Sequence, residues 1–230
     1  MTVDGPAGSG KSTLGRRLGQ ALSLPVVDSG LFYRGLTVAL LRDAVDPADP
    51  HAVQHLAECT EIELNTDPAA DGSAWTLRVD GADVSAAARD PRTAPLLSTV
   101  SGLPGVRAVL LERQRRLGAD GCVAMGRDCG TVVFPKATLK LFLDAAGEVR
   151  AHRRAAQLRD TGASIDAGVL AEEIGGRDRR DMGRLTSPLR AAADAHHIDT
   201  GNRSIESTYA EALRLCREAG LTPLRERARQ

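Results

Sequence analysis

Apolar residues in this chain follow two alternating patterns, short continuous runs and longer stretches with helical spacing. The short runs predict buried strands near residues 2–4, 25–28, 121–125, 139–143 and 195–198. The longer stretches predict helices near residues 11–22, 31–42, 94–100, 104–117, 148–159, 166–181 and 204–220. Strands separated by helices pair in parallel through right-handed crossovers. The pattern therefore predicts an α/β fold in which a five-stranded parallel sheet has helices on both faces.

Residues 47–90 interrupt this pattern. Proline, aspartate and glycine become frequent there, and the apolar residues change from helical spacing to alternation. Residues 61–65 and 75–79 both alternate, and Asp80-Gly81 is typical of a tight turn between paired strands. The segment therefore predicts a small antiparallel sheet inserted into the larger fold, with Trp75 packed inside it.

One motif follows the first predicted strand directly. Residues 5–12, the phosphate loop, read Gly-Pro-Ala-Gly-Ser-Gly-Lys-Ser and match G-x-x-x-x-G-K-[ST] before a predicted helix. Its glycines let backbone N–H groups converge on phosphate oxygens, and the helix N-terminus adds further donors and its dipole. The lysine adds a positive charge, and the serine hydroxyl is a natural Mg²⁺ ligand. We therefore predict that ATP is bound by Gly5, Pro6, Ala7, Gly8, Ser9, Gly10, Lys11, Ser12 and Thr13, with Ser12 on the metal.

Composition narrows the class of protein. A net charge of zero and 3% aromatic residues argue against a nucleic-acid-binding module. The four cysteines form no C-x-x-C pair and no metal-binding spacing, so we expect reduced, mostly buried thiols. The sequence shows no signal peptide and no apolar run of membrane-spanning length. We expect a soluble cytoplasmic protein with no membrane partner, and a monomer because no heptad run stands out.

The positive charge is almost entirely arginine. Only Lys11, Lys136 and Lys140 are lysines. A planar guanidinium suits phosphate better than an ammonium does, because it can donate two parallel hydrogen bonds to phosphate oxygens. A switch GTPase would need an N-K-x-D segment, which the sequence lacks, and residues 121–128 fit the acidic strand end of a motor ATPase poorly. The arginines spread over several predicted elements favour a small kinase with a second anion site. They are Arg34, Arg107, Arg127, Arg153, Arg154, Arg177, Arg180 and Arg184.

Five segments resemble the bacterial cytidylate kinase family, in the family's order. They are residues 4–13, 28–34 (DSGLFYR), 126–135 (GRDCGTVVFP), 177–181 (RDRRD) and 188–189. The resemblance implies transfer of the γ-phosphoryl group of ATP to CMP or dCMP with Mg²⁺, in pyrimidine metabolism. It also implies a P-loop nucleoside-monophosphate-kinase-like three-layer sandwich. The expected parts are a core (1–46, 91–150, 181–230), an acceptor-binding β insert (about 47–90) and a helical lid (about 151–180).

The same resemblance assigns roles to single residues. It implies that Ser29 and Arg34 lie on the acceptor, with Arg34 at its phosphate. Ser98, Arg107 and Asp128 match positions that hydrogen-bond the cytosine ring. Arg177 and Asp181 match residues near the acceptor sugar, and Arg184 matches a second phosphate clamp. The expected catalytic residues are Lys11, Arg127, Arg153 and Arg184, with Arg153 and Arg154 closing over the donor.

Four features stand apart from these assignments. The paired Gly175-Gly176 is expected to loosen the helix before Arg177, since each glycine costs about 1 kcal/mol relative to alanine. We expect Cys129 to have a packing role. Asp166, Asp178 and Asp194 are expected to be helix caps or surface charges. The three-residue first strand is short for a central strand, which suggests that the natural chain begins a few residues earlier.

Other functions stay open at this point. A small kinase of the same fold acting on adenylate, uridylate or a non-nucleotide such as shikimate is the nearest alternative, and Ser98, Arg107 and Asp128 argue against it. A protein that binds ATP without transferring phosphate is disfavoured by the second set of arginines. A nucleic-acid-binding module is the least favoured.

Overall fold

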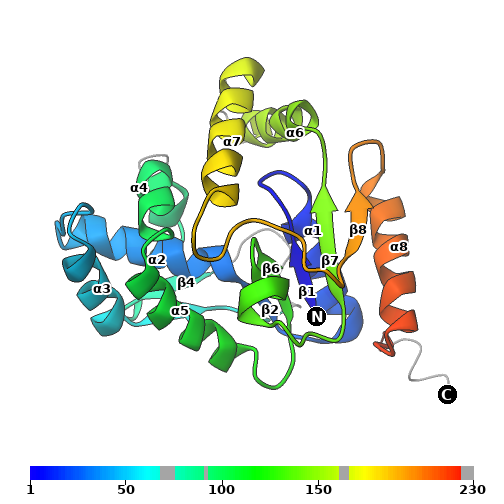
Figure 1. Cartoon of the computed structure of the whole chain (residues 1–230), viewed down its shortest axis with the longest axis horizontal. Coiled ribbons are helices and arrows are strands. Elements are labelled where there is room, and N and C mark those ends of the chain that lie inside the picture. Colours follow the sequence, from blue (N-terminus) through cyan, green and yellow to red (C-terminus); the bar gives the residue numbers. More distant parts are fainter. Residues whose placement is uncertain (68–75, 91–92, 161–165, 224–230) are drawn as a thin grey trace.

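The computed structural model describes residues 1–67, 76–90, 93–160 and 166–223. Its main sheet is parallel and five-stranded, with strand order β2–β6–β1–β7–β8 (Figure 1). The strands are β1 (Thr2–Asp4), β2 (Val26–Asp28), β6 (Val123–Gly126), β7 (Lys140–Asp144) and β8 (His196–Asp199). The predicted sheet is confirmed, and the strand bounds differ from the expected ones by at most two residues.

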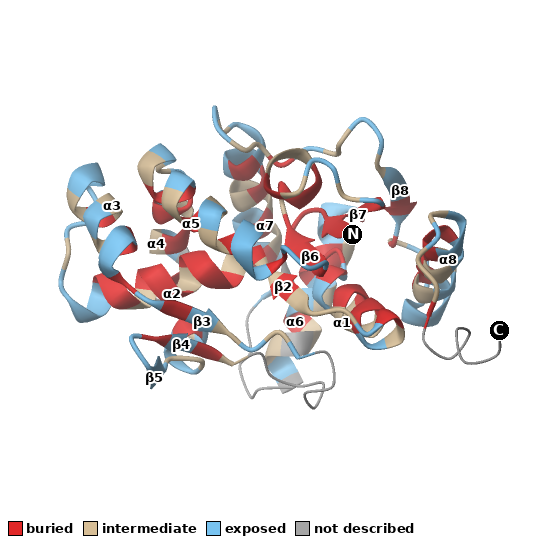
Figure 2. Cartoon of the chain, turned by 90° about the horizontal axis from the view of Figure 1, so that it is seen from below, coloured by how far each residue is buried: buried red, intermediate tan, exposed pale blue. Residues whose placement is uncertain are grey.

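Two apolar cores lie on opposite faces of this sheet. Helices α1 and α8 cover one face, and α2, α4 and α5 belong to the other core together with the inserted segment. Strand β6 contributes to both cores because successive strand side chains point to opposite faces. Val123 and Met125 enter the first core and Ala124 the second. Figure 2 shows buried residues along the strands and on the helix faces that meet them.

The predicted helices are confirmed, with small changes at their ends. They are α1 (Lys11–Leu22), α2 (Ser29–Arg42), α4 (Thr93–Val100), α5 (Pro104–Leu117), α6 (Gly147–Asp160), α7 (Ala167–Met182) and α8 (Ile205–Glu218). Gly175 and Gly176 lie inside α7 without interrupting it. The described helices are all too short or too polar to span a bilayer.

The inserted segment contains the predicted small sheet. Strands β3 (Ile62–Leu64), β4 (Leu77–Val79) and β5 (Ala82–Asp83) pair antiparallel in that order, and a short 3₁₀ turn, η1 (Ala87–Arg89), follows. Trp75 lies outside the described residues.

The expectation that apolar residues alternate throughout this segment was wrong at its start. Helix α3 (Pro50–Cys59) precedes the small sheet. The Asp49 side chain accepts hydrogen bonds from the backbone N–H groups of His51 and Ala52, and proline occupies the first turn. These are ordinary helix-start signals, and the buried Val53 and Ala57 lie on one face because they are four residues apart.

The polar residues that end the strands meet at one edge of the main sheet. Asp4 lies in register with Gly126 and Phe142 of the adjacent strands, and Asp28 with Met125. The carboxyl edge therefore gathers the phosphate loop, Arg127-Asp128 and the end of β7, as expected for an α/β ligand site. In Figure 1, α6 and α7 stand over this edge and the phosphate loop rises towards them.

Candidate active site

The phosphate loop has the backbone of an anion cradle. Gly5, Gly8 and Gly10 have φ angles of 146°, 77° and 95°, which L side chains rarely adopt. Gly10 is the N-cap of α1, and no described side chain caps the first turn of that helix. The N–H groups of this turn therefore remain available to a phosphate.

Lys11 folds back onto the loop. Its Nζ donates to the Pro6 carbonyl at 2.5 Å and to Ser9 Oγ at 3.4 Å. Burial lowers the pKa of Lys11 well below its usual range, and the positive charge of Arg127 lowers it further. A phosphate bound in the loop would have the opposite effect and favour the charged lysine.

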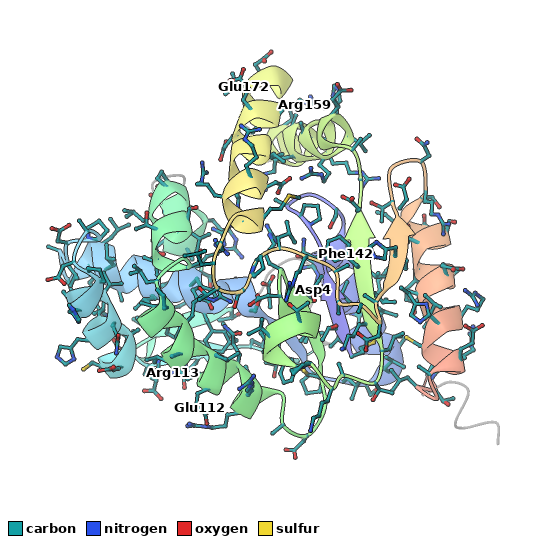
Figure 3. The ribbon with its side chains drawn as sticks, in the orientation of Figure 1. Asp4, Glu112, Arg113, Phe142, Arg159 and Glu172 are labelled. Carbon is teal, nitrogen blue, oxygen red and sulfur yellow. The ribbon has the colours of Figure 1, made fainter. Side chains whose placement is uncertain are left out.

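Asp4 joins the strand that precedes the phosphate loop to the segment that follows β6. Its Oδ1 accepts the N–H of Cys129 at 2.9 Å, and its Oδ2 accepts the N–H of Gly130 at 2.6 Å. The residue is only 4% exposed and lies near the centre of the view in Figure 3. Burial raises the pKa of Asp4 to about 6, although both backbone hydrogen bonds oppose the rise. One carboxylate thus ties the strand before the phosphate loop to the segment that contains Arg127-Asp128.

The segment held by Asp4 contains an element that the pattern did not predict. Residues Cys129–Val133 form one π-helical turn, η2, in which the Cys129 carbonyl accepts the N–H of Phe134, five residues on, at 2.7 Å. Cys129 is fully buried, and burial raises the pKa of its thiol well above the usual value. The predicted packing role of Cys129 is therefore confirmed. Cys122 and Cys216 are also buried, whereas Cys59 is exposed.

A cluster of arginines surrounds Asp181 of α7. Arg184 lies 2.7 Å from Asp181 Oδ1, while Arg127 and Arg177 lie 3.1 Å and 3.9 Å from Oδ2. Burial lowers the pKa of Arg177 to about 10, and the charge of Arg127 adds to this. Burial also lowers the pKa of Arg34, which feels Arg127 as well. One carboxylate does not neutralise three guanidinium groups, so this Asp181 cluster retains positive charge and suits an anion.

A second buried ion pair joins Arg107 of α5 to Asp128. Their side chains are 9% and 7% exposed. Arg107 also donates to the Ser101 carbonyl at 3.1 Å and lies 5.4 Å from the centroid of the Tyr33 ring. These contacts fix the guanidinium from three directions. The pair therefore offers a cationic donor and an anionic acceptor side by side, as the edge of a base requires.

The other predicted site residues lie around this centre. Ser29 is the first residue of α2, and Ser98 Oγ accepts a hydrogen bond from Arg180 Nε at 3.1 Å. Arg34 donates to the Ala88 carbonyl at 2.8 Å. The structure thus gathers Lys11, Arg127, Asp128, Arg177, Asp181 and Arg184 along the carboxyl edge.

Arg153 of α6 lies farther along the same edge and contacts Thr200, the residue that follows β8. It donates to the side chain and the carbonyl of Thr200. Thr200 Oγ1 in turn donates to the Ser9 carbonyl at 3.1 Å. Arg153 therefore reaches the phosphate loop through Thr200, and its catalytic role stays a prediction.

One expectation about the acidic residues was wrong. Asp178 is not a cap or a surface charge, because it is 5% exposed and pairs with Arg150 at 2.5 Å. Its place one turn before Asp181 on α7 was the signal that it shares the inward face. Asp166 does cap α7, and Asp194 is an exposed partner of Lys140. Asp4, Tyr33 and Asp178 lie within the motifs but received no site role from them, and Arg150 lies outside the motifs.

We predict that Gly5→Ala is more damaging than Gly10→Ala. A positive φ costs an alanine about 1–2 kcal/mol at either position. A Cβ at Gly5 would also lie 2.0 Å from the Leu143 carbonyl oxygen, whereas nothing described lies within 4 Å of one at Gly10. Urea denaturation should show Gly5→Ala losing at least about 2 kcal/mol more unfolding free energy. Equal losses would contradict this geometry.

A second prediction concerns Asp4 and pH. Because its pKa rises from 3.8 to about 6 on folding, the folded state binds the proton more tightly. Ionised Asp4 therefore costs stability above about pH 6, and this cost disappears as the pH falls towards 4. The unfolding free energy of the wild type minus that of Asp4→Asn should rise by up to roughly 3 kcal/mol over this range in urea denaturation.

Asp194→Asn is the control for this measurement. Lys140 lowers the pKa of Asp194, so the corresponding difference should fall rather than rise on acidification. A wild-type-minus-Asp4→Asn difference that stays constant with pH would show that the Asp4 carboxyl is not perturbed by burial.

Comparison with known proteins identifies the family of the chain. The family model for cytidylate kinase matches residues 1–218. The cytidylate kinases of Vibrio vulnificus and Salmonella paratyphi B are each 42% identical, over 93% and 95% of both chains respectively. The bifunctional pantoate ligase/cytidylate kinase of Synechococcus elongatus is 43% identical over 96% of this chain, which spans only 42% of that relative's length.

A solved structure, TT1252 from Thermus thermophilus, aligns over 96% of both chains with 21% identity and a TM-score of 0.45. That score is too low for a conclusion about fold or function. The family model, in contrast, extends over nearly the whole sequence. The chain therefore belongs to the cytidylate kinase family.

Proposed function

We propose that this chain transfers the γ-phosphoryl group of ATP to CMP or dCMP, giving ADP and CDP or dCDP. The observation that carries the proposal is the Arg107–Asp128 pair beside the Asp181 cluster, on the sheet edge that holds the phosphate loop. The Arg107–Asp128 pair suits a base, the Asp181 cluster suits a monophosphate, and the phosphate loop suits a triphosphate. Membership of the cytidylate kinase family supports the same reaction.

The buried pair reads the acceptor base. Cytosine offers an exocyclic amine as a donor and ring atoms as acceptors, which complement the carboxylate of Asp128 and the guanidinium of Arg107. Uracil replaces that amine with a carbonyl, which would face the carboxylate without a hydrogen bond. A buried acceptor left unpaired in this way disfavours the wrong base. Ser98 and Ser29 lie on neighbouring helices and complete the acceptor surface.

Charge neutralisation and alignment carry the chemistry. The nucleophile is an oxygen of the acceptor phosphate, already largely ionised near neutral pH, so no general base is required. Lys11 faces the donor phosphates from the loop. Arg34, Arg127, Arg177 and Arg184 surround the region between the two nucleotides and offset the charge of the migrating group.

Helices α6 and α7 act as the lid, about residues 151–180, while residues 47–90 contribute to acceptor binding and the remainder forms the core. The support is that α6 and α7 share their own apolar cluster, formed by Ala151, Ala155, Leu170 and Ile174. A pair of helices with its own core moves as a unit. Closure excludes water, which would otherwise compete as the acceptor. The expected lid residues 161–165 lie outside the described ranges.

Mg²⁺ fits here as an ion held mainly by nucleotide phosphates. Among the described residues, no group of three or more His, Cys, Asp or Glu side chains is arranged to hold a metal. Mg²⁺ commonly binds through substrate phosphates, water and one or two protein oxygens. The exposed Ser12 would supply one such oxygen at the first turn of α1. When bound, the ion neutralises charge on the donor phosphates.

The proposal extends to the protein's setting. We place the reaction in the cytoplasm, in pyrimidine nucleotide metabolism, with a monomeric enzyme whose partners are small-molecule nucleotides.

The test is a coupled ADP-release assay of the wild type and Asp128→Asn with CMP, dCMP, UMP, AMP and GMP. We expect the wild type to prefer CMP and dCMP. The substitution should lower kcat/KM for CMP about 100-fold and lower the CMP-to-UMP preference, because an amide offers a donor where cytosine needs an acceptor. Glu112→Gln, an exposed change on α5 that Figure 3 labels, is the matched control and should leave both values unchanged.

Two outcomes would contradict the proposal. Wild-type activity centred on AMP or UMP would leave the fold intact but remove the acceptor assignment. ADP formation with none of the acceptors would favour a protein that binds ATP without transferring phosphate.

A further inference from the structure

Two arginines connect the phosphate loop to α7. Arg127 donates to the Gly5 carbonyl at 3.1 Å and to Asp181 Oδ2 at 3.1 Å. This bridge belongs to the Asp181 cluster, whose guanidinium groups the proposed reaction needs at the phosphates. It therefore has to rearrange whenever Arg127 turns towards a substrate.

The second bridge has the same form and no part in the proposed chemistry. Arg150 Nη1 donates to the Ala7 carbonyl at 3.1 Å and to Asp178 Oδ2 at 2.5 Å. Its Nε donates to the Ala145 carbonyl at 2.8 Å, just after β7. The backbone of the same residue also packs on the loop, since a Cβ at Gly8 would lie 3.2 Å from the Arg150 carbonyl oxygen. Donor loop, sheet and lid thus meet at one side chain.

Arg150 and Asp178 lie at the two ends of the proposed lid. Arg150 lies immediately before the lid in the chain, and Asp178 lies just before the lid ends. The pair therefore closes the base of the lid, where the chain leaves the core and where it returns. Both side chains are almost completely buried, at 9% and 7% exposure.

We propose that Arg150 and Asp178 are a positioning pair that fixes the base of the lid against the phosphate loop while the lid closes. The inference rests on the proposed function. The described partners of Arg150 are the Ala7 and Ala145 carbonyls and Asp178, so neither side chain has a role in the proposed phosphoryl transfer itself. The pair acts through α7, because it sets where Arg177 and Asp181 stand relative to the loop. It remains in place when Arg127 leaves Asp181 for a substrate phosphate.

The geometry of the contact suits a pivot. Asp178 joins Arg150 through one of its two oxygens, and a single nitrogen–oxygen contact permits rotation that a bidentate pair would resist. The other oxygen, Oδ1, is buried and has no hydrogen-bond partner among the described residues. The carboxylate can therefore turn without breaking a second bond. The separate α6–α7 core keeps the rest of the lid rigid during that rotation.

Loss of the pair should impair closure rather than binding. A lid that does not seat correctly misaligns the arginines and admits water, so phosphoryl transfer to CMP falls more than ATP hydrolysis does. The informative quantity is the ratio of CDP formation to acceptor-independent ATP hydrolysis. A substitution that merely reduces the folded fraction lowers both rates together and leaves this ratio unchanged.

The experiment uses the full chain with Asp178→Asn, which keeps the side-chain volume, and Arg150→Lys, which keeps the charge. Glu172→Gln and Arg159→Gln are the matched controls, exposed changes on the outer parts of α7 and α6 that Figure 3 labels. We measure kcat and KM for CMP, ATP hydrolysis without CMP, and melting temperature. Asp178→Asn should lower kcat roughly 10- to 100-fold, with a smaller change in KM and a transfer-to-hydrolysis ratio at least about tenfold lower.

Arg150→Lys should show an intermediate ratio, because a lysine keeps the charge but reaches fewer acceptors. Both controls should match the wild type. If the ratio is unchanged in Asp178→Asn while kcat falls, the pair is only structural and the inference is overturned. If Asp178→Asn does not fold, the ratio for Arg150→Lys decides in the same way.

Failure of the proposed function gives a different result. A wild type that forms no CDP with ATP and CMP removes the reaction. The pair is then tested by amide hydrogen exchange with ATP present. Faster exchange at residues 176–182 in Asp178→Asn than in Glu172→Gln would support the pair as the fixed base of α7, and equal exchange would overturn it.

Discussion

The site depends on keeping several cations buried next to one another. Burial and neighbouring positive charge both disfavour an ionised side chain, and they lower the pKa values of Lys11, Arg34 and Arg177. Asp181 and Asp128 offset part of this charge without removing it. The excess suits the two phosphorylated nucleotides of the proposed reaction, since their own repulsion has to be overcome when they meet. In that proposal, substrate binding also relieves the repulsion among the buried cations.

The fold meets this requirement with a few acidic residues, each placed where two segments of the site meet. Asp4, at the end of the strand before the phosphate loop, holds the segment after β6 through the N–H groups of Cys129 and Gly130. Asp128 belongs to that segment and directly precedes Cys129. Asp178 and Asp181 lie one turn apart on α7 and face arginines that also bond to phosphate-loop carbonyls. Each carboxylate thus sets a distance between two parts of the site. The proposed lid, α6 and α7, has its own apolar core, separate from the two cores of the sheet.

Local signals were sufficient for the elements that depend on local chemistry. The phosphate loop follows from its glycines and Lys11-Ser12, and the main strands from short apolar runs between helices. The sequence also carried the signal for α3 in Asp49-Pro50, but the alternating residues farther on obscured it. The η2 turn was less accessible, because it depends on hydrogen bonds to Asp4, more than a hundred residues away.

The same reasoning explains the error at Asp178. An aspartate beside several arginines on a helix is usually exposed, and its spacing from Asp181 indicates only a shared face, not the burial that α6 and Arg150 create. Resemblance to a family predicted roles for several arginines and for Asp128 and Asp181, which pair with them. It gave no role to Arg150 or Asp178, whose partners lie on other elements.

The most direct measurement is calorimetric binding of an analogue that links cytidine to adenosine through a chain of phosphates. In the proposed site, a base-binding pair, a cluster of arginines and the phosphate loop lie on one sheet edge, so one molecule should engage all three. We expect affinity at least about 100-fold above that of ATP or CMP alone, and clearly weaker binding of the uridine counterpart. Binding no tighter than that of ATP, or equal binding of the uridine analogue, would contradict this arrangement.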